Sequence, residues 1–282
     1  MKYEIHFNYK CNQNCIFCSV LQHPQRDLEL SDLDLILPFI HNNQIVQISG
    51  GEPLLNTNLI KWVKEIKKKT RFISLTTNGT LLNKDNLNEL INLGVNCFII
   101  SLHSNTINNF KKITTTDNFN NVINCLELFK KINNSSIKVI VNTVITKYNI
   151  SEIFDLFKML HEKYGFAKIK LSYPRFYKFA KSDFNCKIHL LSLTDVHFFL
   201  KDIINKPYFD KLIIENIPSC IIKPSKEYRD WSTKLLTVDG IKDSVDNTRY
   251  YMKKCVTCNL RLNCQGFHKY YNYYFDDYIL ET

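Results

Sequence analysis

Cys11-Asn-Gln-Asn-Cys15-Ile-Phe-Cys18 is the stretch around which the rest of the chain is organised. It follows an apolar, strand-like run from Tyr3 to Tyr9 and places three thiols in one short loop. Such a loop can direct three thiolates at one soft metal centre, and thiolates favour iron–sulfur clusters or zinc. A closed structural zinc site needs four ligands, and the next candidate, His23, lies outside the loop. Three cysteines around a cubane cluster would leave one iron open for another ligand.

Composition limits the class of protein. Of the 282 residues, 45% are hydrophobic and 23% charged, as in a water-soluble chain with a substantial core. No apolar run approaches the roughly 18 residues of a membrane span, and residues 1–4 begin no signal peptide. We therefore predict a cytoplasmic protein without a membrane segment, in which the ten cysteines include metal ligands rather than disulfides.

The formal net charge of +10 raises the question of an anionic partner such as nucleic acid. However, the lysines are scattered along a chain that is also rich in Asn and Ile. The main basic run, residues 61–69, falls on a predicted helix and is expected to form its solvated face. Charge alone therefore does not lead us to predict a nucleic-acid partner.

Short β-rich runs alternate with amphipathic helical patterns up to about residue 175. Six β–α repeats predict a parallel sheet with helices outside it, either a partial barrel or a doubly wound sheet. Asn83, Asn118 and Ser151 are candidate N-caps, and Gly94 and Gly165 are candidate helix ends. The predicted strands are Tyr3–Tyr9, Ile45–Ser49, Phe72–Thr76, Cys97–Leu102, Lys138–Val144 and Lys168–Ser172, and the predicted helices are Leu33–Ile40, Leu59–Ile66, Leu87–Leu93, Val122–Ile132 and Ile153–Leu160.

Small and polar residues follow the predicted strands at their carboxyl ends, where ligands bind in both of these folds. Gly50-Gly51-Glu52-Pro53 follows the second strand, and Thr76-Thr77-Asn78-Gly79 ends the third. Ser101 and His103 lie at the end of the fourth, and Asn142 lies in the fifth. Because the cysteine loop follows the first strand, we expect these residues to converge on one site.

In combination, these motifs resemble the radical S-adenosylmethionine (SAM) superfamily. The resemblance rests on the loop Cys11–Cys18, with Phe17 before its third cysteine, on Gly50–Pro53 and on Thr76–Gly79. It implies an α/β fold in which a partial (β/α)6 barrel, residues 1–175, carries a [4Fe–4S] cluster on Cys11, Cys15 and Cys18. It also implies that SAM chelates the open iron through its amino and carboxylate groups.

The resemblance further assigns SAM-binding residues at the strand ends. Glycines after the second strand would let backbone approach the methionine amino group, and Glu52 would either join this polar edge or order the turn. Gly165 is a further candidate for the adenine, and His103 is either a site acid or base or a satisfied loop histidine. The predicted SAM-binding residues are Phe17, Gly50, Gly51, Glu52, Asn78, Ser101, Asn142 and Ile169, of which Asn78, Ser101 and Asn142 have the alternative role of strand-end caps.

Beyond about Pro174 the β–α alternation stops. Ser192-Leu-Thr-Asp195 is similar to a capping box, with Asp in place of the usual Glu or Gln, and predicts a helix through Ile204. A strand is expected over Lys211–Glu215. The Tyr-rich tail, residues 270–278, either lines a pocket or only packs against the rest of the protein.

The last third of the chain carries a second group of cysteines. Cys255-x2-Cys258-x5-Cys264, preceded by Cys220, supplies four soft ligands, enough for a closed site. Beside a first iron–sulfur centre, a second [4Fe–4S] cluster is favoured over zinc. The spacing resembles the auxiliary-cluster extensions called twitch or SPASM domains, so residues 176–282 are predicted to form a small α+β domain of this kind.

Two features of this second group are left open. His268 stands where SPASM proteins have another cysteine, which favours the one-cluster, twitch-like form. Cys220 either completes the cluster or leaves an open iron for substrate. Cys97 and Cys125 are expected in the core, and no role is assigned to Cys186.

The resemblance implies a radical SAM oxidoreductase or maturase. The enzyme would cleave SAM reductively to a 5′-deoxyadenosyl radical, which abstracts a substrate hydrogen, and the auxiliary cluster would aid an oxidation or crosslinking. A ribosomally synthesised peptide is the favoured substrate, with a sugar, nucleotide or cofactor precursor as the alternative. RNA modification and a non-enzymatic iron–sulfur protein are the remaining hypotheses. Flavodoxin or ferredoxin would donate electrons, and no catalytic acid or base is identified.

Overall fold

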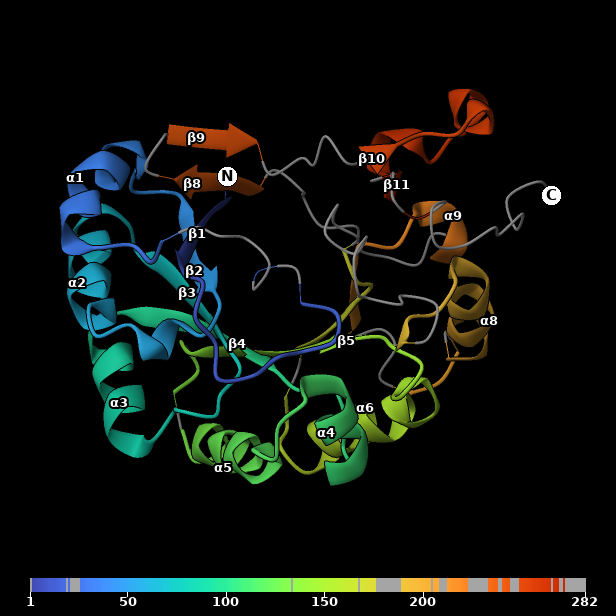
Figure 1. The fold of residues 1–282 in the computed structure, drawn as a ribbon, viewed down its shortest axis with the longest axis horizontal. Helices are drawn as coiled ribbons and strands as arrows, with labels where there is room; N and C mark the ends of the chain where they lie inside the picture. The colour runs from blue at the N-terminus through green and yellow to red at the C-terminus, as the bar shows by residue number, and fades with distance from the viewer. Residues whose placement is uncertain are drawn as a thin grey trace.

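A curved sheet organises the molecule, with α1 to α6 along its outer side (Figure 1). The computed structural model describes residues 2–18, 20, 26–132, 134–166, 168–175, 189–203, 205–207, 212–222, 233–237, 240–243, 249–264, 266–268 and 271. Within these residues the strand order is β7-β6-β5-β4-β3-β2-β1-β8-β9. Neighbouring strands from β7 through β1 to β8 are parallel, and β9 is antiparallel to β8.

The barrel strands are β1 Lys2–Asn8, β2 Ile45–Gly50, β3 Phe72–Thr77, β4 Val95–Ser101, β5 Lys138–Val144, β6 Lys168–Ser172 and β7 Leu212–Glu215. The helices outside them are α1 Leu33–Ile36, α2 Leu59–Lys69, α3 Lys84–Asn92, α4 Ile107–Thr114, α5 Phe119–Lys130 and α6 Ile153–Glu162. The later elements are α8 Leu193–Ile203, α9 Ser219–Ile222, β8 Thr233–Thr237, β9 Gly240–Asp243, β10 Arg249–Tyr250 and β11 Phe267–His268. None of the helices in the described ranges is long and apolar enough to cross a membrane.

The predicted α/β class and the partial barrel are confirmed, and all six predicted strands are present within two residues of their expected bounds. The capping box at Ser192 opens α8, with Asp195 N–H bonded to the Ser192 hydroxyl at 3.1 Å. The predicted cap at Ser151 is wrong, because a 3-10 turn over Ile150–Glu152 precedes α6. The predicted domain boundary after residue 175 stays a prediction, and β7 extends the barrel sheet beyond it.

Helix α4 was missed by the sequence analysis. It is short and buries only Phe110, Ile113 and Thr114, while Asn and Lys occupy most of its other positions. The Thr106 hydroxyl accepts a hydrogen bond from Asn109 N–H at 3.4 Å, which is the N-cap signal that could have located it. This helix matters because its last turn holds the cysteine loop.

The outer face of the sheet is apolar. Along β1, every second side chain is apolar and buried against the helices: Tyr3, Ile5 and Phe7. The rings of Phe7 and Trp62 of α2 meet edge to face, with centroids 5.5 Å apart. Burial of large side chains on this face provides most of the hydrophobic stabilisation, at roughly 25 cal/mol per Å².

The inner face of the same sheet is largely polar. Glu4, Gln47 and Ser74 pair in register across β1, β2 and β3, so that one polar row crosses three strands. A second row joins Ser101, Asn142 and Lys170 across β4, β5 and β6. Between the rows, a small apolar cluster fills part of this face. It consists of Cys97, Ile99, Ile140 and Ile213.

Among the residues that the structure describes, the inner face holds buried side-chain oxygens without a hydrogen-bond partner: Gln47 Oε1, Ser74 Oγ and Thr76 Oγ1. A buried hydroxyl without a partner loses its hydrogen bonds to water and forms none within the protein, which lowers the free energy of unfolding by about 1–3 kcal/mol. Such groups are usually explained by water or by a ligand. The inner face is therefore built for polar contents.

We predict that Thr76→Val leaves the free energy of unfolding of the metal-free protein unchanged or raises it. Thr143→Val is the matched control, because the Thr143 hydroxyl is buried and donates to Leu102 O at 2.7 Å. The control variant should lose about 1–2 kcal/mol, since it leaves a carbonyl unsatisfied. Urea unfolding measures the free energy of unfolding of both variants. An equal decrease in the two would contradict the interpretation that the Thr76 hydroxyl faces a polar ligand or water rather than a protein partner.

Candidate functional site

The cysteine loop leaves β1 and is held by the end of α4. Asn14 N–H donates to Thr114 O at 3.1 Å, and Ile16 N–H donates to Ile113 O at 2.9 Å. The Cys18 N–H bonds back to Cys15 O at 2.9 Å and closes the loop on itself. Backbone bonds thus fix the loop that carries all three thiols.

The three thiols lie close enough to influence one another. Burial, together with the neighbouring Cys18 and Cys11, raises the pKa of Cys15. Burial also raises the pKa of Cys11, although Gln13 N–H donates to its sulfur at 3.4 Å. A bound metal cluster would relieve this repulsion, because its positive core is held by thiolates.

The donors fit a [4Fe–4S] cluster in type and position. Three soft sulfur ligands share one loop, and backbone and amide N–H groups point at the Cys11 sulfur. In the described ranges no three His, Cys, Asp or Glu side chains already stand in a metal-binding arrangement. The fit is therefore one of ligand chemistry and loop position.

The turn after β2 packs directly against the chain that leaves β1. Gly51 N–H donates to Asn8 O, and Glu52 N–H donates to Lys10 O, both at 2.7 Å. A Cβ on Gly51 would lie 2.1 Å from Lys10 O, and one on Gly50 would lie 2.3 Å from Asn8 O. Both glycines are thus required by the approach of residues 8–10, and their predicted contact with SAM stays a prediction.

Glu52 is fully buried and joins two strand ends. Its carboxylate accepts hydrogen bonds from the Thr77 hydroxyl and Asn78 N–H, each at 2.7 Å, and from Leu54 N–H at 3.1 Å. Burial raises the pKa of Glu52 to about 7 in spite of these donors. The observed contacts favour its predicted role in ordering the turn, and its role in SAM binding stays a prediction.

Asn78 reaches the cysteine loop from the end of β3. Its Nδ2 donates to Asn12 Oδ1 at 2.7 Å and lies 3.7 Å from Cys11 Sγ. Its Oδ1 accepts from the Thr80 hydroxyl at 2.7 Å, and Asn12 Nδ2 donates to the same hydroxyl at 2.8 Å. Asn12 and Thr80 belong to this site but were missed, although Asn12 lies within the cysteine motif and Thr80 directly follows the motif Thr76–Gly79.

Ser101 and Asn142 lie opposite each other in register at the inner face, and both are partly buried. Asn142 Oδ1 accepts from the Ser172 hydroxyl at 2.8 Å. These two residues therefore share the carboxyl edge with Asn78, as expected. Their assignment to the ribose and carboxylate of SAM stays a prediction.

The predicted adenine contacts differ in their surroundings. Phe17 lies at the cysteine loop, with its ring edge-to-face on His103 at 4.8 Å between centroids. Ile169 packs in the outer core and is 1% exposed, so only its backbone can face the inner side. Gly165 lies between α6 and β6, before the amino end of β6, and its suggested contact with adenine stays a prediction.

His103 is a buried, neutral histidine. Burial lowers its pKa to about 3, and its Nδ1 accepts a hydrogen bond from Val144 N–H at 3.1 Å. The ring proton therefore resides on Nε2. These contacts favour the satisfied loop histidine over a site acid or base.

The second group of cysteines is brought together from two segments. Burial and the neighbouring Cys264, Cys255 and Cys258 raise the pKa of Cys220 to about 11. The Cys264 sulfur accepts hydrogen bonds from Ser219 N–H at 3.3 Å and Gly266 N–H at 3.4 Å. Four soft ligands with backbone N–H donors fit a second iron–sulfur cluster by chemistry and position.

The structure describes some of the remaining cysteines and one residue of the Tyr-rich tail. Cys125 is buried in the main core as expected, Cys97 packs in the inner apolar cluster, and Cys186 lies outside the described residues. His268 is buried in β11. Tyr271, the one described residue of the Tyr-rich tail, is buried and accepts a hydrogen bond from Leu193 N–H at 2.7 Å.

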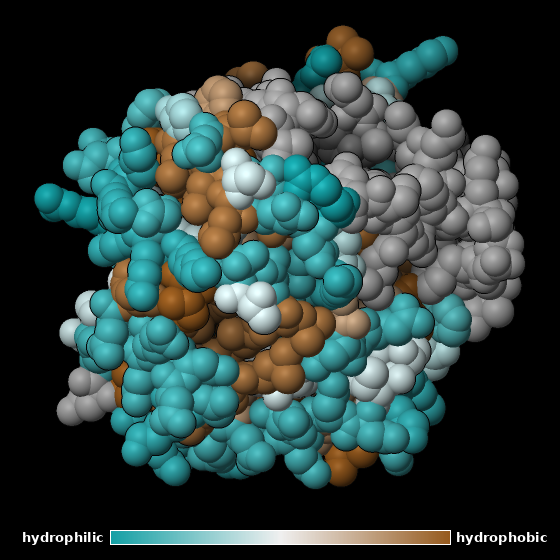
Figure 2. Space-filling view, turned by 60° about the vertical axis from the view of Figure 1, so that its left-hand side comes forward, coloured by the Kyte–Doolittle hydropathy of each residue, from teal (hydrophilic) through white to brown (hydrophobic). Residues whose placement is uncertain are grey.

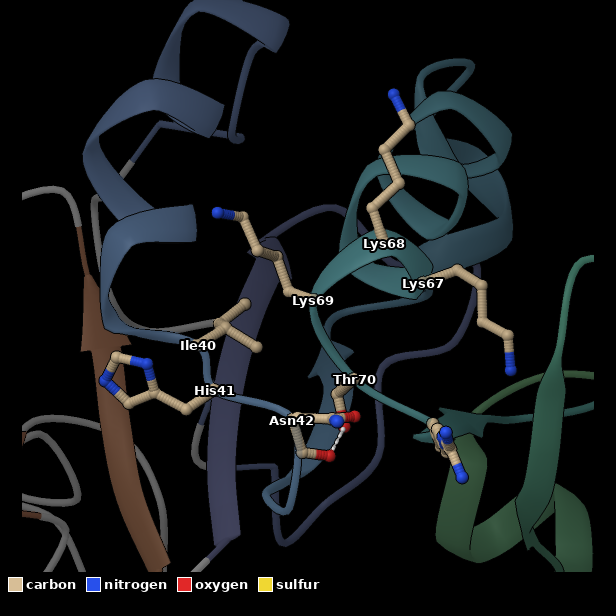
Figure 3. Close-up of a pocket in the computed structure, with 8 residues that line it drawn as sticks. Ile40, His41, Asn42, Lys67, Lys68, Lys69 and Thr70 are labelled. Carbon is tan, nitrogen blue, oxygen red and sulfur yellow. Dashed lines mark hydrogen bonds between the residues drawn. The ribbon is translucent and has the colours of Figure 1, made fainter.

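A surface hollow of about 740 Å³ lies at the opposite edge of the sheet, where β2 and β3 begin. Figure 3 shows the ammonium groups of Lys67, Lys68 and Lys69 pointing apart rather than at one centre. Lys68 pairs with Glu65 at 2.6 Å. The side of the molecule that bears α1, α2 and α3 is mainly hydrophilic (Figure 2), in keeping with a solvated lysine face.

Comparison with known proteins identifies the barrel. A family model described as the radical SAM superfamily matches residues 5–160. The chain belongs to the radical SAM superfamily. Members of this superfamily bind a [4Fe–4S] cluster and SAM. The assignment of Cys11, Cys15 and Cys18 to the cluster, and of the carboxyl edge beside them to SAM, stays a prediction.

Curated relatives match somewhat more than half of this chain. A probable GTP 3′,8-cyclase of Saccharolobus islandicus is 33% identical over 172 residues, which are 59% of this chain and 54% of the relative. A GTP 3′,8-cyclase of Clostridium perfringens is 32% identical over 163 residues, or 54% of this chain and 49% of the relative. The matches span about half the length of these relatives.

Solved structures of proteins with bound S-adenosylmethionine match almost the whole chain. Streptococcus suis SuiB bound to S-adenosylmethionine gives a TM-score of 0.66 at 16% identity and covers 100% of this chain and 77% of that one. The enzyme anSMEcpe with bound AdoMet gives 0.69 at 16% identity and covers 95% and 88%. At this identity the likeness concerns the fold alone, and it extends beyond the barrel.

We predict that Glu52→Gln removes a pH dependence from the stability of the metal-free protein. The folded pKa of about 7 lies above the ordinary value of 4.5. The neutral acid therefore stabilises the fold at low pH, and this contribution of about 2 kcal/mol fades as pH rises from 5 to 7. Urea unfolding at both pH values measures it, with the exposed Glu89→Gln as control. An unchanged pH slope in Glu52→Gln would argue against the raised pKa.

Proposed function

We propose that the chain is a radical SAM enzyme that oxidises or crosslinks a residue of a ribosomally synthesised peptide with the aid of an auxiliary [4Fe–4S] cluster. The gathering of Cys220 with Cys255, Cys258 and Cys264 carries this proposal, since Ser219 N–H, one residue before Cys220, donates to the Cys264 sulfur at 3.3 Å. A chain that only generated the radical would have no use for a second set of four thiols. This set would provide an electron acceptor at the end of the reaction.

When bound, the first cluster supplies the electron that splits SAM into methionine and a 5′-deoxyadenosyl radical. Asn78 and Asn142 would orient SAM at the carboxyl edge, and the buried Glu52 would hold Asn78 in place through its N–H. The peptide would lose two hydrogens, one as an atom to the deoxyadenosyl group and one as a proton to water, and the electron left by the second hydrogen would pass to the auxiliary cluster.

Two observations support a peptide substrate. The fold likeness runs over 95–100% of the chain and thus includes the segments that carry the second group of cysteines. Among these neighbours, SuiB has been solved with the precursor peptide SuiA and anSMEcpe with a peptide. We propose the same class of substrate here.

A small polar molecule is the second candidate. The curated relatives at 32–33% identity are named as GTP 3′,8-cyclases. The polar inner face, with Glu4, Lys170 and Glu215 on three strands, suits a hydrophilic ligand. A test that offers the protein a member of each class therefore separates the two candidates.

Cysteine variants should separate the two metal sites. Replacing Cys11, Cys15 and Cys18 with Ala should leave about four of about eight irons and abolish SAM cleavage. Replacing Cys255 and Cys258 with Ala should also leave about four irons, while reductive SAM cleavage continues. Iron analysis and 5′-deoxyadenosine formation measure these outcomes. Cleavage by the first variant, or about four irons in the intact protein, would refute the corresponding site.

The substrate class can be tested with two probes. Synthetic peptides encoded by short reading frames beside the gene should stimulate 5′-deoxyadenosine formation and lose two hydrogens by mass spectrometry, whereas GTP should remain unchanged. The Cys255→Ala, Cys258→Ala variant is the matched control and should not convert the peptide. Consumption of GTP, with no change in any peptide, would favour the small-molecule candidate.

A further inference from the structure

The second group of cysteines comes from two separate parts of the chain. Cys220 follows β7 by five residues, whereas Cys255, Cys258 and Cys264 lie in a later loop between β10 and β11. Before a metal binds, only noncovalent contacts can keep the two parts in position. The contacts around the end of β7 are therefore important for this site.

The last residue of β7, Glu215, is fixed to the barrel. Its Oε2 accepts from Lys170 Nζ at 2.9 Å and lies 3.2 Å from the Ser172 hydroxyl. Its backbone oxygen accepts from Tyr173 N–H at 2.9 Å. Although burial favours the neutral acid, Lys170 and Arg175 hold the pKa of Glu215 at about 2, so the pair is ionic at neutral pH.

The next residue, Asn216, turns the chain away from the sheet. Its φ is +65°, a left-handed conformation that Asn tolerates better than most residues other than Gly. The side chain is buried, and its Nδ2 donates to Tyr173 O at 3.2 Å. Its Oδ1 accepts from Arg249 Nη2 at 2.9 Å.

Arg249 belongs to the segment that carries the other cysteines. It lies in β10, which pairs with β11, so that Arg249 is opposite His268 and Tyr250 is opposite Phe267. The loop between these strands contains the three cysteines. Gly266, at φ +70°, turns the chain back toward β11, and its N–H bonds to the Cys264 sulfur.

We propose that Asn216 is a positioning residue that sets Cys220 against the cysteine loop of residues 255–264 through its hydrogen bond with Arg249. The inference rests on the proposed second cluster and deepens it. One amide ties the part that carries Cys220 to two neighbours: Nδ2 bonds to the barrel chain that leaves β6, and Oδ1 bonds to β10 in the part that carries the other cysteines. The bond between Ser219 N–H and the Cys264 sulfur is the consequence of this alignment.

The same contacts reach the SAM site. The Ser172 hydroxyl that lies near Glu215 also lies 2.8 Å from Asn142 Oδ1, and Asn142 is a predicted SAM residue. Polar contacts therefore run from the SAM edge through β6 and β7 to Asn216 and the later cysteines. Asn216 thus relates the position of the second metal site to that of the first.

Two variants separate the backbone role of Asn216 from its side-chain role. Asn216→Gly keeps the left-handed turn but removes both side-chain bonds, whereas Asn216→Asp keeps the acceptor for Arg249. Arg249→Gln removes the same bond from the other partner. The exposed Asn108→Gly and Arg71→Gln serve as controls for each change.

Iron content and electron paramagnetic resonance should be measured with Cys11, Cys15 and Cys18 replaced by Ala, so that the second cluster is observed alone. Asn216→Gly and Arg249→Gln should lower its occupancy at least about twofold or change its spectrum, and Asn216→Asp should restore the parent signal. In the otherwise wild-type protein, basal SAM cleavage should be unchanged. Parent-like occupancy and spectra in all variants would overturn the positioning role.

Alkylation of the metal-free protein tests the inference independently of any cluster. Iodoacetamide should modify Cys220 and Cys264 about tenfold faster in Asn216→Gly than in the parent or Asn108→Gly, because a bond to a charged group is lost. Unchanged alkylation rates would overturn the proposal. If the parent with the three Ala replacements holds no iron while alkylation still responds, the second cluster fails and the alignment of the cysteines by Asn216 stands.

Discussion

Two short backbone hydrogen bonds join the turn after β2 to the chain that leaves β1, and the first metal site depends on them. They connect Gly51 with Asn8 and Glu52 with Lys10, at 2.7 Å each. The approach is so close that neither glycine has room for a Cβ. The cysteine loop begins at the next residue along the chain, so its starting point and direction are set by this contact. The buried carboxylate of Glu52 then ties the same turn to the end of β3.

The two faces of the sheet have different roles: the outer face stabilises the fold, and the inner face carries polar groups. On the outer face, alternating apolar residues pack against the helices and fix the strand register. The inner face has fewer buried apolar side chains. It carries charged and hydrogen-bonding groups instead, including oxygens without a partner among the described residues. A parallel barrel can tolerate this because its outer core already determines the register, and a one-residue shift would expose that core. The polar inner face is thus free to serve a ligand.

Local motifs made the barrel and the first site predictable from the sequence. Three cysteines in one loop, glycines after a strand and alternating apolar residues each depend on neighbours a few positions apart. They predicted the strands, the carboxyl edge and the cysteine loop. The motifs did not reveal why the glycines are required, because Gly51 is constrained by Lys10, which is remote in sequence. Likewise, α4 and its contacts with Asn14 and Ile16 depend on tertiary packing rather than on a strong helical pattern.

The second group of cysteines illustrates a different limit. Spacing alone predicted that Cys255, Cys258 and Cys264 act together, but Cys220 could be joined to them only as a hypothesis. The structure brings its thiol near theirs, and the contacts responsible involve residues that carry no recognisable motif: Glu215, Asn216 and Arg249. A left-handed Asn at the end of a strand is ordinary in sequence and becomes informative only when its two amide atoms are seen to bond to different parts of the chain. The alignment of a site built from distant segments is therefore encoded in the residues that join those segments as much as in its ligands.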